Sequence, residues 1–190
     1  MTYGTFIEAF GQFGRQLEFL SKAIGHDETR LAFHNIKIEP SDAVEGKYRA
    51  VASDGRRLHI VDPLSCPDNI GVEPGLWRFL RSTTKTAWIA RVGEKGALDF
   101  PNYRRVIPDT QATFETEYWS GFETGKSCVA ALGPLVKFIN SFPSPTVINP
   151  AYLADLGCEV WKVSYRGNSE AVVFESGNLK AIIMPLEYIV

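Results

Sequence analysis

A series of short apolar segments separated by tight polar turns most limits how this chain folds. Leu31–Glu39 alternates apolar and polar residues, and Tyr48–Ser53 and Arg57–Val61 repeat this strand-like pattern. The Asp54-Gly55 pair between the last two segments is typical of hairpin turns, because glycine adopts positive φ without strain. The pattern predicts three consecutive antiparallel strands.

An amphipathic pattern precedes these strands. Apolar residues recur at spacings of three and four from Phe6 to Ile24, with Thr5 as a candidate N-cap and Gly25 as a stop. The spacing predicts one helix over this segment. Its polar face carries two cations seven residues apart, Arg15 and Lys22.

The next segment suggests that a structural unit is repeated. Glu73-Pro74 predicts the start of a short helix through Ser82, because proline is favoured at the first helical position. This helix would expose Arg78 and Arg81. The order of apolar, polar, proline and small residues in Val72–Leu80 returns 76 residues later in Ile148–Leu156. We therefore predict a duplicated unit of a strand, a helix and further strands.

The remaining elements are predicted from shorter patterns. A helix containing Lys137 is predicted over Lys126–Phe142. Strands are predicted at Ile70–Val72, Thr86–Val92, Phe114–Trp119, Glu159–Tyr165, Ala171–Phe174 and Lys180–Met184. The proline-flanked stretch Phe100–Pro108 is the best candidate for an interdomain connector, which predicts domains at residues 1–107 and 108–190.

Length and charge narrow the class of partner. A chain of 190 residues accommodates one large domain or two small ones. Its 20 basic and 22 acidic residues exclude a uniformly basic nucleic-acid-binding surface. Residues 1–108 carry 15 basic and 13 acidic side chains, whereas the rest carry 5 and 9. An anionic partner is therefore expected to meet the first part.

Cysteine usage and hydropathy indicate the compartment. Cys66, Cys128 and Cys158 form no CxxC pair, which argues against a disulfide framework and a cysteine-rich zinc site. No uncharged apolar stretch approaches the ~20 residues that a membrane span requires. We expect a soluble cytoplasmic protein that has no membrane partner.

Motifs for catalysis are weak. Gly121–Ser127 ends like a phosphate-binding loop but has one residue too few between its glycines. Ser82–Lys85 has the SxxK spacing of certain serine hydrolases without their other motifs, and the three histidines lack the spacing of a metal pair. We predict a protein that is not an enzyme and has no metal and no cofactor. Nucleotide binding at Gly125-Lys126-Ser127 is the enzyme-class alternative.

Three segments carry a family resemblance. Ala52–Leu58 reads Ala-Ser-Asp-Gly-Arg-Arg-Leu, Phe100–Pro108 reads Phe-Pro-Asn-Tyr-Arg-Arg-Val-Ile-Pro, and Ile182–Leu186 reads Ile-Ile-Met-Pro-Leu. In this order they resemble the bacterial DNA polymerase III beta sliding clamp, whose pattern runs ATDGHRL, FPDYRRVLP and VVMPM. The match covers most of the chain and corresponds to the middle and last of the family's three domains.

The resemblance implies an α+β fold of DNA-clamp domains, with helices lining one face and antiparallel sheets on the other. It implies a processivity factor for DNA replication, which tethers polymerase or repair proteins to double-stranded DNA without sequence preference. Because the family's ring has six domains, two domains per chain imply a homotrimer. The alternative is a clamp-like protein-interaction module that does not encircle DNA.

The resemblance also implies where partners bind. Family partners insert a short peptide, a glutamine followed by two or three apolar residues, between the middle and last domains. Matched position by position, this pocket would be formed by Ser53, Gly55, Arg56, Arg57, Leu58, Pro101, Arg105, Val106, Ile182, Ile183, Met184, Pro185 and Leu186. Arg56 replaces the family's usual histidine, and Glu187 replaces a common basic residue. The candidates for facing DNA in a ring are Arg15, Lys22, Arg78, Arg81 and Lys137.

Overall fold

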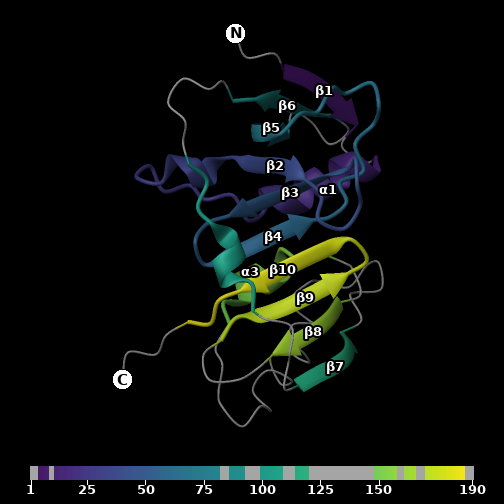
Figure 1. Cartoon of the computed structure of the whole chain (residues 1–190). Coiled ribbons are helices and arrows are strands. Elements are labelled where there is room, and N and C mark those ends of the chain that lie inside the picture. Colours follow the sequence, from purple (N-terminus) through teal and green to yellow (C-terminus); the bar gives the residue numbers. More distant parts are fainter. Residues whose placement is uncertain are drawn as a thin grey trace. The chain divides into compact units, whose positions relative to one another are not determined.

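The chain divides into two compact units built on antiparallel strands (Figure 1). The structure is a computed structural model that describes residues 4–8, 11–81, 86–92, 99–108, 114–119, 148–157, 161–165 and 170–186. The first unit is Met1–Asn102 and the second is Tyr103–Val190. The boundary expected from the sequence, after residue 107, lies within the same proline-flanked stretch.

The described residues of the first unit form six antiparallel strands. In spatial order they are β1 (Gly4–Glu8), β6 (Thr86–Arg91), β5 (Gly75–Arg81), β2 (Ile36–Pro40), β3 (Tyr48–Ser53) and β4 (Arg57–Val61). The predicted strands at Tyr48–Ser53 and Arg57–Val61 are confirmed. The hairpin that joins them places Ser53 opposite Leu58, and Gly55 at its tip has a φ of 89°.

One helix, α1 (Gln12–Ser21), packs against this sheet (Figure 1). Its apolar stripe of Phe13, Leu17 and Leu20 is buried, as the spacing of three and four predicts. The His59 ring of β4 is also buried and stacks on Phe19 of the helix, with ring centroids 4.2 Å apart. This ring contact joins the helix to β4.

The predicted boundaries at the start of the chain are wrong. Gly4–Glu8 is a strand paired with β6, and the helix begins only after Gly11. A short apolar segment such as Phe6-Ile7 fits a strand or a helix equally well, and pairing with β6 decides for the strand. Leu31–His34 is a 3₁₀ helix, so the strand predicted from Leu31 begins at Ile36.

The predicted helix at residues 73–82 is also wrong. Gly75–Arg81 is strand β5, in which Trp77 and Phe79 are buried while Arg78 and Leu80 are exposed. This strand pairs with β2 on one side and β6 on the other. Its large apolar residues suit a pleated sheet, and pairing on both sides overrides the proline signal for a helix start.

The proposed duplication fails for the same reason. Asn149 caps α3 (Pro150–Ala154), because its side-chain oxygen accepts a hydrogen bond from the Ala151 backbone N–H at 3.0 Å. The similar pattern around Pro74 leads into a strand instead, and the strand predicted at Ile70–Val72 is irregular backbone. One local pattern therefore gives two different structures.

In the described part of the second unit, four strands lie in the order β7 (Phe114–Trp119), β8 (Trp161–Tyr165), β9 (Val172–Ser176) and β10 (Leu179–Ile183). All four correspond to strands that the sequence predicts. Trp161 and Phe174 are fully buried and form the centre of this unit's described core. The predicted helix at Lys126–Phe142 and the motifs Gly121–Ser127 and Ser82–Lys85 lie outside the described residues.

None of the helices in the described ranges is long and apolar enough to cross a membrane. The same ranges hold no group of three or more His, Cys, Asp and Glu side chains placed to bind a metal ion.

Cys66 lies in the irregular segment between β4 and β5, where its thiol contacts the carbonyl oxygens of Pro67 and Ile70 at 3.5 Å. Burial raises the pKa of this thiol, and the nearby Asp68 carboxylate adds to the rise. Since the thiolate is the nucleophile, alkylation of Cys66 by iodoacetamide should be slower at pH 8 than that of the urea-unfolded chain. Mass spectrometry of the Cys66 peptide measures both rates across pH. Identical pH profiles would contradict this prediction.

Candidate partner-binding surface

The Ser53–Leu58 turn is held by its own side chains. Ser53 Oγ donates to the Arg57 carbonyl at 2.8 Å and accepts from the Gly55 N–H at 3.0 Å. Asp54 Oδ1 accepts from the backbone N–H groups of Arg56 and Arg57 at 2.9 and 3.0 Å. These bonds fix the turn before any partner arrives.

The two arginines of this turn differ in what they offer a partner. Arg57 Nε donates to Asp54 Oδ2 at 2.9 Å, and both side chains are largely buried. Arg56 is exposed at the tip of the turn. Ser53 and Leu58 are buried, so they support the turn from beneath. Arg56 is therefore the cation of this turn that is accessible at the surface.

Two residues beside this turn were missed by the sequence analysis. A Cβ placed on Gly55 would lie 3.0 Å from Arg30 Nη1 and 3.8 Å from the Phe33 ring. Phe33 in turn packs edge-to-face on Phe100, with ring centroids 6.1 Å apart. Leu31, next to Arg30, is 50% exposed. The 3₁₀ helix at Leu31–His34 brings Arg30 and Phe33 to the turn. The strand predicted for this segment does not lead to that placement.

The connector and the end of β10 carry further exposed residues. Pro101 is exposed, and in the 3₁₀ helix Tyr103–Val106 the Tyr103 ring is buried while Arg105 and Val106 are exposed. After the buried pair Ile182 and Ile183, the chain leaves the strand with Pro185 half-buried. Two apolar side chains there are exposed, Met184 by 38% and Leu186 by 39%.

The candidate DNA-facing cations do not share one surface. Arg15 and Lys22 are exposed on and just after α1. His59 contacts α1, and the strand registers place Trp77 on this helix-covered face of the sheet. Because successive strand residues point to opposite faces, Arg78 lies on the other face. The expected grouping of Arg78 with the helix cations is therefore wrong. The side chain of Arg81 and the whole of Lys137 lie outside the described part.

Solved structures with similar folds identify this architecture. The C. crescentus beta sliding clamp aligns with a TM-score of 0.59 and 16% identity, covering 98% of this chain and 66% of that one. DNA polymerase III subunit beta from Borrelia burgdorferi aligns with a TM-score of 0.60 and 10% sequence identity. This alignment covers 97% of this chain and 64% of the Borrelia chain. The DNA polymerase III beta subunit from Thermotoga maritima aligns with a TM-score of 0.53 and 17% sequence identity. This alignment covers 97% of this chain and 65% of the Thermotoga chain. The chain has the sliding-clamp fold.

The expected α+β DNA-clamp fold is thereby confirmed. The chain spans about two thirds of the length of the clamps that it matches. No protein-family model matches the sequence, and the comparison with curated proteins gave no match. At 10–17% identity the clamp fold is established by backbone arrangement rather than by sequence.

Proposed function

We propose that this chain is a clamp-type processivity factor that tethers DNA polymerase or repair proteins to double-stranded DNA. The observation that carries the proposal is the clamp fold over 97–98% of the chain. The chain would act in the cytoplasm as a binding protein, with no catalytic step, metal or nucleotide of its own.

Partners are proposed to bind as short peptides on the exposed residues of three segments. The segments are the Ser53–Leu58 turn, the connector with Pro101, Arg105 and Val106, and the end of β10 from Met184 to Leu186. Exposed apolar side chains such as Val106 and Met184 supply area that a peptide can bury. Arginine side chains beside them can orient a peptide through its carbonyl or carboxylate oxygens. Ile182 and Ile183 are buried and would act by holding Met184 in place.

The glycine at the turn provides a sharp test of this surface. Gly55→Ala and Gly46→Ala both place a side chain at positive φ, at 89° and 73°, and should each cost about 1 kcal/mol of stability. A Cβ at Gly46 meets no atom of the described residues within 4 Å, whereas one at Gly55 would lie 3.0 Å from Arg30 Nη1, so that the guanidinium must shift slightly. Gly55→Ala alone should therefore weaken binding of a labelled clamp-type peptide, measured by fluorescence anisotropy. Equal affinities of the two variants would mean that peptides do not use this turn.

DNA contact is proposed at α1. Replacing both Arg15 and Lys22 by alanine should weaken DNA binding and lower the slope of log K against log salt by about 2, since each cation neutralises one phosphate. Arg78→Ala is the matched control, because this exposed cation lies on the other face of the sheet. Filter-binding titrations at several salt concentrations measure the DNA affinity and the salt slope of each variant. A larger effect from Arg78→Ala would contradict the assignment to α1.

The alternative function is a clamp-like interaction module that binds partner peptides without encircling DNA. The separation of Arg78 from the cations of α1 favours it, because it reduces the positive surface around the helix. The mass in solution distinguishes the two functions. A trimer at micromolar concentration supports the ring, and a strict monomer supports the module.

A further inference from the structure

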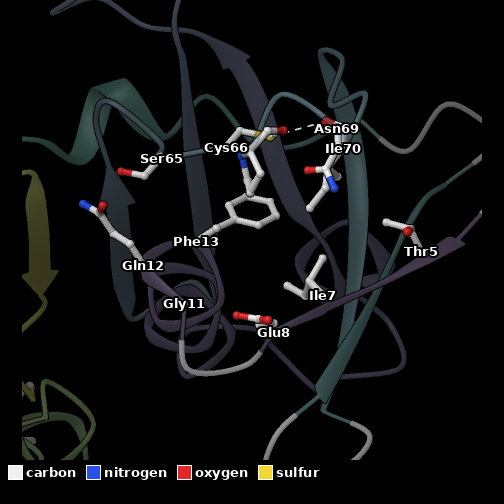
Figure 2. Close-up of a pocket in the computed structure, with 11 residues that line it drawn as sticks. Thr5, Ile7, Glu8, Gly11, Gln12, Phe13, Ser65, Cys66, Asn69 and Ile70 are labelled. Atoms are coloured by element: carbon white, nitrogen blue, oxygen red, sulfur yellow. Dashed lines mark hydrogen bonds between the residues drawn. The ribbon is translucent and has the colours of Figure 1, made fainter.

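The first unit contains an open cavity at the start of α1, with a volume of about 570 Å³. It is bounded by β1, by the beginning of the helix and by the segment that follows β4 (Figure 2). Its size falls within the range of small-molecule pockets, roughly 300–1,000 Å³. The described residues that line it all lie outside the three segments of the partner-binding surface.

Apolar side chains form the inner part of this cavity. Ile7 and Phe13 are almost fully buried, and Ile70 is half-buried beside them. Figure 2 shows Ile7 and Phe13 facing the same space, with Cys66 and Ile70 on its other side. An apolar group of a ligand would therefore leave water on entering the cavity.

One carboxylate, that of Glu8, lines the cavity. Glu8 is exposed, and Figure 2 shows its carboxylate directed toward the space between Ile7 and Phe13. Among the described residues that line the cavity, Glu8 is the one carboxylate and none is basic. The exposed Asp68 lies in the chain between two further lining residues, Pro67 and Asn69. The Cys66 thiol is neutral at pH 7, because burial raises its pKa, so it does not change this balance.

Neutral polar groups complete the lining. The side-chain amides of Gln12 and Asn69 and the hydroxyl of Thr5 are exposed; Figure 2 shows the Asn69 amide beside Ile70 and the Gln12 amide directed away from Phe13. Their oxygen atoms can accept hydrogen bonds from an N–H donor. Gly11, which precedes the helix, also lines the cavity beside Glu8 and has no side chain to fill it.

We propose that this cavity binds a small organic cation with an apolar body, such as an arylalkylammonium ion. The apolar body lies against Phe13, Ile7 and Ile70, and the ammonium group lies beside the Glu8 carboxylate. The side-chain oxygen of Asn69 accepts one of its remaining N–H groups. The site adds a small-molecule function to a chain whose proposed partners are DNA and peptides.

The test uses 2-phenylethylammonium as the probe and 3-phenylpropionate as an anion of similar size. A ¹H–¹⁵N NMR titration of the full chain follows backbone amides around the cavity, including Gly11, Gln12 and Cys66. The cation should give saturable shifts confined to these amides and bind more tightly than the anion. Glu8→Gln should weaken binding of the cation about fivefold, the size expected for one exposed ion pair, and should not weaken binding of the anion, because it removes a like charge. Glu45→Gln, an exposed glutamate outside the cavity, is the matched control.

A second variant keeps the test decisive. Ile70→Trp fills the cavity and should remove the saturable shifts, while the rest of the spectrum keeps its dispersion. Three results would overturn the proposal: no saturable shifts, equal affinity for the cation and the anion, or unchanged binding of the cation to Ile70→Trp. None of these results bears on the clamp proposal, because the described lining of the cavity includes no residue of the proposed peptide and DNA surfaces.

Discussion

Replacing Met184 by lysine is expected to weaken binding of a clamp-type peptide about thirtyfold, equivalent to about 2 kcal/mol. Met184 is 38% exposed at the end of β10, where its flexible thioether can pack on a leucine or phenylalanine of the peptide. A lysine at this position brings an ammonium group to an apolar contact and must lose hydration when the peptide binds. Fluorescence anisotropy of a labelled peptide measures the change.

Val44→Lys is the matched control for this experiment. Val44 is an apolar residue with a similar exposed fraction, 41%, in the turn between β2 and β3. The same change in charge and size there should leave peptide affinity unaltered. If wild type and Met184→Lys bind the peptide equally well, the end of β10 is not part of the partner surface.

The second large effect concerns stability. Arg49 of β3 is buried and donates through Nε to Glu39 Oε1 at 2.7 Å, and its guanidinium also bonds to Asp42. Asp62 lies 3.9 Å from the same guanidinium. Arg49→Met leaves Glu39 and Asp62, both largely buried, without this cation. The free energy of unfolding should therefore fall by about 3 kcal/mol in urea denaturation.

Two further variants distinguish the effect of the buried Arg49 ion pairs on stability from the effect of losing an exposed charge. Lys37 also pairs with Glu39, at 2.8 Å, but is one-third exposed, so Lys37→Met should cost less than about 1 kcal/mol. Adding Glu39→Gln to Arg49→Met should recover part of the loss, because it removes one buried charge. If Arg49→Met and Lys37→Met cost the same, Arg49 does not hold this part of the sheet together.

The hairpin and the described strands of the second unit were predictable from sequence because local signals there agree with the tertiary structure. Tyr48–Ser53, Asp54-Gly55 and Arg57–Val61 give a strand, a turn and a strand in both the pattern and the fold. Gly75–Arg81 was not predictable, since Pro74 signals a helix and only pairing with β2 and β6 makes a strand. The same holds for β1, which exists because β6 lies beside it.

The candidate site was only partly accessible from sequence. The motif at Ala52–Leu58 directed attention to the turn, but it did not show that Asp54 binds Arg57 and leaves Arg56 exposed. Arg30 and Phe33 carry no motif, and their contact with the turn depends on a 3₁₀ helix that the alternating pattern concealed. Their placement requires knowing how the backbone turns before β2.

Retention on circular DNA tests the central claim most directly. The protein is first diluted to favour free subunits and mixed with nicked circular plasmid. The mixture is then concentrated so that rings close around the DNA. A labelled partner peptide is added, and the mixture is passed over a size-exclusion column. A tethering clamp should elute with the plasmid, carry the peptide with it, and leave the plasmid after a single cut makes it linear. Equal retention on circular and linear plasmid, or none on either, would contradict the proposal that this chain encircles DNA.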